Sequence, residues 1–314
     1  MSEFEKRLKA ARESSWRHFG KKIVFYLPGM FVLNGVNGKY PAISITGNAC
    51  ALQCDHCQGK ILGSMLQTPT PEQLVALCLE LAAKGRHGVL ISGGCDLWGR
   101  LPWDRFIPAI EEIKRRTDLF VSIHSGLLGE REAFGLKQVG VDQALIDVIG
   151  DDQTFKRMVH VSFGVERIHD AMVALQNVGL PMIPHIVCGL NYGRIKGEKQ
   201  AVDMVAGFEV EQLVIVSLMS IPGTPVRRVI PPTAEAVADI IAEARSKMPA
   251  TRISLGCARQ RGNTLLETLA IDAGVNRMAL PSDEAVARAK SYDLEIRYQK
   301  TCCSVTRDLS GPGW

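Results

Sequence analysis

The sequence lacks the features that mark membrane, fibrous and disordered proteins. No stretch of its 314 residues is apolar for the length of a bilayer, and no low-complexity or Pro/Gly/Ser-rich segment divides the chain. The 37 Lys and Arg residues nearly balance the 33 Asp and Glu residues, so the net charge is only +4. We therefore expect a globular protein with no nucleic-acid or membrane partner.

The amino-terminal segment also lacks the apolar core of a secretory signal. Residues 1–22 are charged and amphipathic, which predicts a cytoplasmic protein. Cytoplasmic thiols stay reduced, so clustered cysteines there favour metal ligands or reactive groups over disulfides. The nine cysteines, an odd number, are therefore the most informative residues of the chain.

Short β-branched apolar runs alternate with amphipathic segments along most of the sequence. This alternation predicts βαβ units around a parallel sheet. Eight units match an α/β fold of the (β/α)8 TIM-type barrel class, although a doubly wound open sheet uses the same local pattern. The expected strands are 42–46, 88–92, 119–124, 144–148, 182–187, 213–218, 252–255 and 277–280.

The barrel is expected over residues 41–291. Residues 1–40 would add a helical extension, and residues 292–314 a tail that crosses the barrel mouth. Barrel enzymes build their sites at the carboxyl ends of the strands. The reactive side chains of this sequence fall at those ends, so we expect the active site there.

Three cysteines follow the first expected strand as CxxxCxxC: Cys50, Cys54 and Cys57. Thiolates at these spacings can converge on one small iron–sulfur cluster. A structural zinc site or a ferredoxin-type cluster normally has four protein ligands, whereas three leave one iron open to another molecule. The spacing therefore predicts a 4Fe–4S cluster with a free position.

This motif resembles that of the radical S-adenosylmethionine (radical SAM) superfamily, whose members carry CxxxCxxC after the first strand of a full or partial barrel. The resemblance implies that the open iron binds S-adenosylmethionine (SAM) and that one electron cleaves SAM to a 5'-deoxyadenosyl radical. His56 takes the place of the ring-bearing residue that usually precedes the last cysteine. These properties are expectations for the present chain.

Further residues resemble the SAM contacts of that superfamily. A GGE-like motif usually meets the SAM amino group, and here Cys95 replaces its acid, with Asp96 as the alternative. Asp147 resembles the residue that bonds the SAM ribose, but a lone Asp there is equally expected to cap a helix. The predicted SAM-contacting residues are therefore His56, Ser92, Gly93, Gly94, Asp96 and Asp147.

The resemblance is strongest to the branch of biotin synthases, lipoyl synthases and hydrogenase maturases, through residues 252–280. Biotin synthases hold a second cluster on cysteines inside three strands and on an arginine. Arg259 matches that arginine, but the expected strands carry no matching cysteines in their interiors. This difference argues against biotin synthase itself.

Three other cysteines suggest a second, auxiliary iron–sulfur cluster. Cys257 follows the seventh expected strand, and a tail folded over the mouth would bring Cys302 and Cys303 to it. With residues 25–29, this pattern resembles the subunits of two-component lipoyl synthases of archaea and some bacteria. That resemblance implies a sulfurtransferase of lipoate biosynthesis that acts on an octanoyl-lysyl carrier domain, with a paralogous partner subunit and ferredoxin or flavodoxin as electron donor.

Two other functions use the same motifs. A related radical SAM enzyme of rearrangement or hydrogenase-cofactor maturation would not need the tail cysteines. A non-catalytic iron–sulfur carrier would not need SAM. The tail cysteines and SAM cleavage therefore distinguish the three hypotheses.

Overall fold

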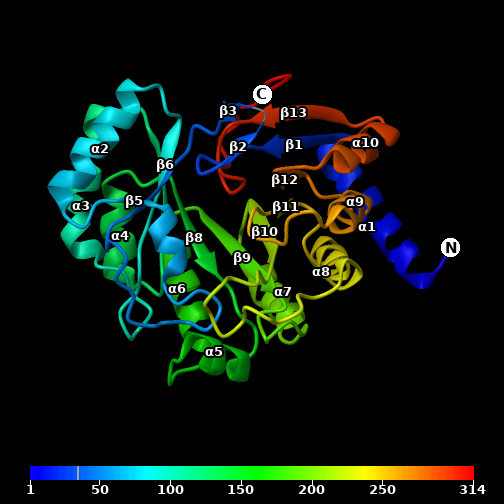
Figure 1. Cartoon of the computed structure of the whole chain (residues 1–314), viewed down its shortest axis with the longest axis horizontal. Helices are drawn as coiled ribbons and strands as arrows, with labels where there is room; N and C mark the ends of the chain where they lie inside the picture. The colour runs from blue at the N-terminus through cyan, green and yellow to red at the C-terminus, as the bar shows by residue number, and fades with distance from the viewer. Residues whose placement is uncertain (34) are drawn as a thin grey trace.

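The computed structural model describes residues 1–33 and 35–314, and it contains every strand expected from the sequence. One parallel sheet of eleven strands forms the centre, with helices on its outer side (Figure 1). The expected strands are β4 (Ala42–Ser44), β6 (Gly88–Ser92), β7 (Phe120–His124), β8 (Gln143–Asp147), β9 (Met182–Cys188), β10 (Gln212–Ser217), β11 (Arg252–Leu255) and β12 (Arg277–Ala279).

The sheet is a curled half-barrel, which confirms the TIM-type α/β class while leaving the sheet open. Its order is β13-β1-β12-β11-β10-β9-β8-β7-β6-β4-β5, and the edge strands β5 (Leu66–Gln67) and β13 (Glu295–Gln299) do not pair with each other. Strand β1 (Lys22–Tyr26) lies between β12 and β13, so the amino-terminal segment contributes to the sheet. A small hairpin of β2 (Val32–Leu33) and β3 (Val36–Asn37) follows β1.

Six of the ten helices that the structure describes begin at a polar residue whose side chain caps the first turn, and the helices bury one apolar side. Thr70 accepts a hydrogen bond from the backbone N–H of Gln73, and Pro71 occupies the first turn that this cap starts. In α3, residues Phe106, Ile110 and Ile113 recur at helical spacing and are all fully buried. The helices are α1 (Glu3–Phe19), α2 (Pro71–Ala83), α3 (Trp103–Arg116), α4 (Glu130–Gln138), α5 (Asp152–Val159), α6 (Glu166–Asn177), α7 (Glu198–Ala206), α8 (Ala234–Lys247), α9 (Thr264–Asp272) and α10 (Asp283–Ser291).

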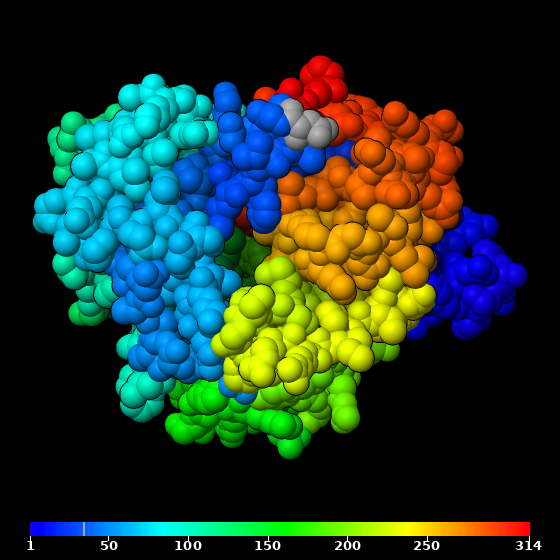
Figure 2. All heavy atoms as spheres, viewed as in Figure 1, coloured from blue at the N-terminus to red at the C-terminus, as the bar shows by residue number. Residues whose placement is uncertain are grey.

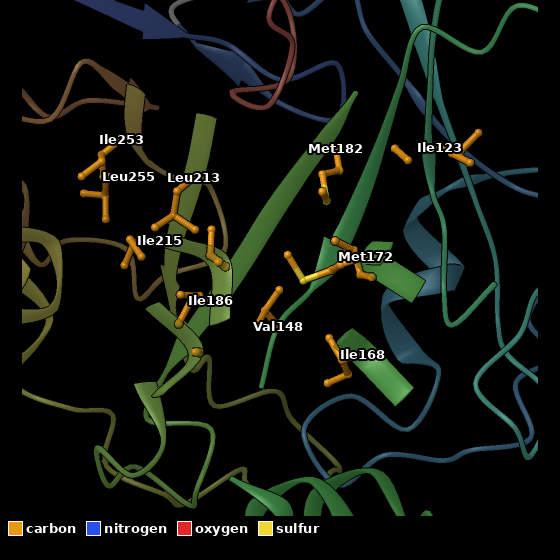
Figure 3. Close-up of a cluster of buried hydrophobic side chains, with 14 of the residues drawn as sticks. Ile123, Val148, Ile168, Met172, Met182, Ile186, Leu213, Ile215, Ile253 and Leu255 are labelled. Carbon is orange, nitrogen blue, oxygen red and sulfur yellow. The ribbon is translucent and has the colours of Figure 1, made fainter. Parts of the chain in front are cut away.

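The main core lies between the sheet and these helices. Figure 3 shows part of it, where Ile186 and Leu213 from the sheet gather with Ile168 and Met172 of α6. Full burial of such a side chain contributes roughly 1.5–3 kcal/mol. Among the described residues, no helix combines the length and the apolar character that crossing a membrane requires.

The carboxyl-terminal tail lies inside the curled sheet, which differs from the expected position over the mouth. Gln212 and Gln143 donate hydrogen bonds to the carbonyls of Cys303 (2.7 Å) and Ser304 (2.9 Å), and Arg277 donates to Val305 (2.8 Å). These donors are the first residues of β10, β8 and β12. The tail therefore enters from the amino-terminal ends of the strands, where its backbone satisfies polar groups that would otherwise be buried without partners.

Candidate active site

A cavity of about 250 Å³ lies at the carboxyl ends of β4 and β6 to β9. Figure 2 shows a hollow in the centre of one face, bordered by blue, orange and yellow segments. Most of the predicted site residues meet in the cavity, although they come from three separate strand–helix connections. Those that line it are Cys50, Cys54, His56, Cys57, Ser92, Gly93, Gly94 and Asp147.

The loop after β4 carries the three cysteines and is folded into tight turns. The backbone N–H groups of Cys57 and Gln58 both donate to the carbonyl of Cys54, at 3.1 and 2.8 Å. Burial raises the pKa of the Cys54 thiol, and the neighbouring Cys57 and Cys50 raise it further. The three thiols therefore lie close enough to repel one another as thiolates, the arrangement that a cluster of positively charged irons would stabilise.

A second loop, after β6, packs directly on the cysteine loop. The N–H of Gly94 donates to Thr46 Oγ1 at 2.7 Å, and the N–H of Ala51 donates to the carbonyl of Cys95 at 2.7 Å. A Cβ atom at Gly94 would stand 2.0 Å from the carbonyl oxygen of Ala49 and 2.5 Å from the Cβ of Cys50. Only glycine permits this approach of the two backbones.

The side chain of His56 faces the same cavity with one nitrogen unsatisfied. Its Nδ1 atom is buried and has no hydrogen-bond partner among the described residues, and burial lowers the pKa of the imidazole. A buried nitrogen without a hydrogen-bond partner, next to three thiols, is expected where a polar ligand binds. The residues present therefore fit an iron–sulfur cluster with a bound polar ligand.

The thiols are not arranged around a single ion. Within residues 1–33 and 35–314, no three His, Cys, Asp or Glu side chains converge as the ligands of one metal ion must. A cluster takes each thiolate on a different iron and so spreads its ligands farther apart.

Asp96 does not reach the cavity, whereas Cys95 does. The exposed carboxylate of Asp96 accepts hydrogen bonds from the N–H groups of Trp98 (2.8 Å) and Arg100 (2.9 Å), which closes a turn. Cys95 lines the cavity, and burial is the main reason that its pKa rises to about 12. The neutral thiol of Cys95, and not the acid of Asp96, is thus the group presented at this position.

Asp147 ends β8 beside two histidines that the neighbouring strands supply. Its Oδ2 atom lies 3.5 Å from Nε2 of His124, the last residue of β7, and its Cα pairs in register with His185 of β9. Burial opposes ionisation of Asp147, yet His124, His185 and His56 together lower its pKa to about 2. The side chain is 53% accessible because it faces the cavity, so this carboxylate is an anion open to a ligand.

The pKa values of the two histidines shift in opposite directions. Burial would lower the pKa of His124, but the Asp147 carboxylate outweighs burial and raises it. Burial lowers the pKa of His185 to about 4, and its Nδ1 lies 3.0 Å from the carbonyl of Ile183. At neutral pH His185 is therefore uncharged and donates through Nδ1, which leaves Nε2 as an acceptor. The connection of both histidines to Asp147 comes from strand register, which no sequence motif marks.

The predicted auxiliary cysteines Cys257, Cys302 and Cys303 do come together, inside the sheet and outside the cavity lining. The Cys303 thiol lies close enough to both of the others to interact with them electrostatically. These contacts, with Ser304 Oγ at 3.1 Å, lower the pKa of Cys302 to about 6 despite its burial. Leu90 and Val187 line the cavity and also pack against the cluster that contains Cys303, so the thiol group lies behind that part of the cavity wall.

The three other residues that the sequence suggested stabilise the fold: Arg259, Cys78 and Cys188. Arg259 is fully buried, and it donates to Glu267 (2.7 Å) and to the carbonyls of Gly256 (2.6 Å) and Ala279 (2.8 Å). These hydrogen bonds connect β11 to α9 and β12, so the guanidinium donates to groups that stabilise the fold. Cys78 and Cys188 are fully buried in the main core.

Comparisons with known proteins agree with the motif. The family model of the Radical SAM superfamily matches residues 44–197. The biotin synthases of Alkalilimnicola ehrlichii and Herminiimonas arsenicoxydans are 23% and 24% identical over 242 and 246 residues, 74% of this chain and 72% and 70% of those proteins. A biotin synthase of Vesicomyosocius okutanii is 23% identical over 174 residues, so the match spans 53% of that relative and 55% of this chain.

Two solved structures share the fold over most of the chain. Methylornithine synthase superposes with a TM-score of 0.63 at 18% identity, covering 98% of this chain and 84% of its own. A maturase of the [FeFe]-hydrogenase superposes with a TM-score of 0.66 at 15% identity, covering 94% and 69%. At these identities the likeness concerns the fold alone.

Proposed function

Residues 44–197 form a radical SAM domain related to that of biotin synthases, and from this premise we propose that the enzyme inserts sulfur at unactivated C–H bonds as a lipoyl synthase. Its substrate would be an octanoyl-lysyl carrier domain. The proposal includes a paralogous partner subunit and a ferredoxin or flavodoxin as electron donor. It is supported by how the chain arranges two groups of thiols around one interior space.

The cavity residues would hold the radical-generating cofactors. Cys50, Cys54 and Cys57 would ligate a 4Fe–4S cluster. When bound, the cluster and SAM supply the electron and the sulfonium whose cleavage gives a 5'-deoxyadenosyl radical. Gly94 lets the loop after β6 pack on the cysteine loop, and the Asp147 carboxylate would accept hydrogen bonds from hydroxyl or ammonium groups of the bound ligand.

The observation that carries the proposal is the second thiol group, which is buried behind the part of the cavity wall that Leu90 and Val187 form. Sulfur insertion needs a hydrogen-abstracting radical and a sulfur atom held at contact distance from the new carbon radical. Cys257, Cys302 and Cys303 would ligate an auxiliary cluster that supplies this sulfur. A rearrangement enzyme has no use for such a thiol group.

The cavity wall matches an alkyl chain. Between the polar groups, its lining consists of aliphatic and aromatic side chains, which exclude water from a radical reaction. The strand interiors also differ from the biotin synthase pattern, since β6 and β7 contain no cysteine and Cys188, at the end of β9, is buried in the main core. The apolar lining residues include Leu90, Ile146, Val148, Ile149, Phe155, Ile168, Val187 and Leu190.

The experiment is anaerobic reconstitution followed by reaction with SAM, dithionite and an octanoyl-lysyl peptide. Mass spectrometry should show a gain of sulfur on the peptide together with 5'-deoxyadenosine. Iron analysis should fall by about one cluster in the Cys257→Ala/Cys302→Ala/Cys303→Ala variant, with Cys78→Ala as the control. 5'-Deoxyadenosine without a sulfur gain, and iron unchanged in the triple variant, would instead support a rearrangement or maturation enzyme. Absence of 5'-deoxyadenosine would leave an iron–sulfur carrier.

A further inference from the structure

Exposed cations gather on four loops at the carboxyl ends of the strands. Lys60, Arg194, Arg227, Arg228 and Arg261 are all exposed and form no ion pair with any residue that the structure describes. We call these five residues the cationic rim. They belong to the loops that follow β4, β9, β10 and β11.

The four loops are almost free of acidic residues. In the segments 45–65, 189–197, 218–233 and 256–263, the single Asp or Glu is Asp55. Its side chain is only 16% exposed, because it is paired with His160 at 2.9 Å and hydrogen-bonded to the Tyr192 hydroxyl. The positive charges of the rim are therefore not neutralised from within their own loops.

The rim is continuous because the four loops touch. A Cβ atom at Gly223 would lie 2.5 Å from Lys60 Nζ, and one at Gly193 would lie 2.1 Å from the carbonyl oxygen of Ile230. The N–H of Ser217 donates to the carbonyl of Ala258 at 2.9 Å. In Figure 2 the blue, yellow and orange segments accordingly border one hollow.

We propose that the cationic rim docks an acidic face of the protein domain that delivers the acyl substrate to the cavity. This inference rests on the proposed function, since it names the surface that the carrier domain would use. Five cations without ion pairs on adjoining loops attract and orient a partner of opposite charge. Ile230, which is 85% exposed within the rim, adds an apolar contact.

The rim is suited to a protein rather than to a nucleic acid. Single-stranded nucleic acids bind where cations alternate with aromatic platforms on which bases stack. Tyr192 is the only Phe, Tyr or Trp in the four loops, and Asp55 and the guanidinium of Arg157, 4.4 Å from the ring centroid, engage it. Outside these loops, the ring of Phe31 is already covered by Arg261, whose guanidinium lies 5.1 Å from the ring centroid. The space behind the rim is small and mostly apolar, which fits a flexible acyl arm extended from a folded domain.

The test measures the binding of an octanoyl-lysyl carrier domain of net negative charge to the reconstituted enzyme. In Arg227→Glu/Arg228→Glu, the Kd should rise about tenfold or more, and its dependence on ionic strength should weaken. The control is Arg115→Glu/Arg116→Glu, which makes the same charge change in another adjacent exposed pair, at the end of α3. The control should bind as the wild type does.

Three results would overturn the inference: no binding by the wild type, an unchanged Kd in Arg227→Glu/Arg228→Glu, or an equal loss in both double variants. Tighter binding of a single-stranded RNA that the first variant abolishes would reassign the rim to nucleic acid. A separate assay measures sulfur transfer by the wild type to the free octanoyl-lysyl peptide. It tests the reaction without the docking of a carrier domain. Failure of the chemistry is therefore distinguishable from failure of the docking surface.

Discussion

The carboxylate of Asp147 lies 3.5 Å from the Nε2 atom of His124, and the two residues end adjacent parallel strands. His124 lines the cavity that receives the first three cysteines, and it also interacts electrostatically with Cys302. The contact between Asp147 and His124 fixes the position of the Asp147 carboxylate and favours its ionised form.

The His124→Gln variant should raise the pKa of Asp147. Without the imidazole only His185 and His56 oppose the effect of burial, so the carboxyl should titrate above the present value of about 2. Carbon-13 NMR of the cluster-free protein would follow the carboxyl directly. His169→Gln, on α6 and in contact with Phe208, is the control, and an unchanged Asp147 midpoint in His124→Gln would refute the assignment.

Stability should vary with pH through the same pair. The depressed pKa of Asp147 means that its contribution to stability is present above pH 3.8 and is lost as the pH falls toward about 2. The raised pKa of His124 has the opposite sign, so its contribution is present below pH 6.5 and declines as the pH rises through the folded value. Chemical denaturation across this pH range should show both changes in the free energy of unfolding in the wild type and neither in His124→Gln/Asp147→Asn.

Replacement of Gly94 by alanine should disrupt the cysteine loop. The added Cβ meets the carbonyl oxygen of Ala49 at 2.0 Å, so one of the two backbones must move. We expect a loss of about 1–3 kcal/mol in the free energy of unfolding and a lower iron content after reconstitution. Gly313→Ala, where nothing lies within 4 Å of the added atom, should change neither, and a Gly94→Ala protein with full iron content would contradict this account.

Gln143, the first residue of β8, should stabilise the carboxyl-terminal tail. Its fully buried amide donates to the Ser304 carbonyl at 2.9 Å and accepts from the N–H of Thr306 at 3.2 Å. Gln143→Ala leaves these groups unsatisfied, at a cost of about 1–3 kcal/mol. Denaturant unfolding measures this loss, with the exposed Gln200→Ala as control. Equal stability of the two variants would show that the tail does not depend on this contact.

Arg259→Leu should destabilise the protein without changing a cluster spectrum. The variant leaves Glu267 as an unpaired buried charge, which typically costs about 3–5 kcal/mol. Thermal unfolding would report the loss, and the double variant Arg259→Leu/Glu267→Leu should recover part of it. A stable Arg259→Leu protein with an altered iron–sulfur spectrum would instead make Arg259 a ligand, as in the biotin synthase pattern.

Local sequence signals were sufficient for the strands and for the cysteine motif. β-Branched runs predicted all eight barrel strands, because burial on both faces of a parallel sheet demands continuous apolar segments. They did not predict β1 and β13, whose pairing depends on how the two ends of the chain return to the same edge. The sequence also left Cys95 and Asp96 as alternatives, and backbone turns at Trp98 and Arg100 decided between them.

The sequence by itself determined that three thiolates at fixed short spacing follow a strand, since loop length alone brings such sulfurs together. Only the tertiary structure decided that the tail enters from the opposite end of the strands, that Cys257 meets Cys302 and Cys303, and that Asp147 is held by His124. These relations join residues from distant parts of the chain. They depend on strand register and on the hydrogen-bonding needs of buried polar groups, which local periodicity does not record.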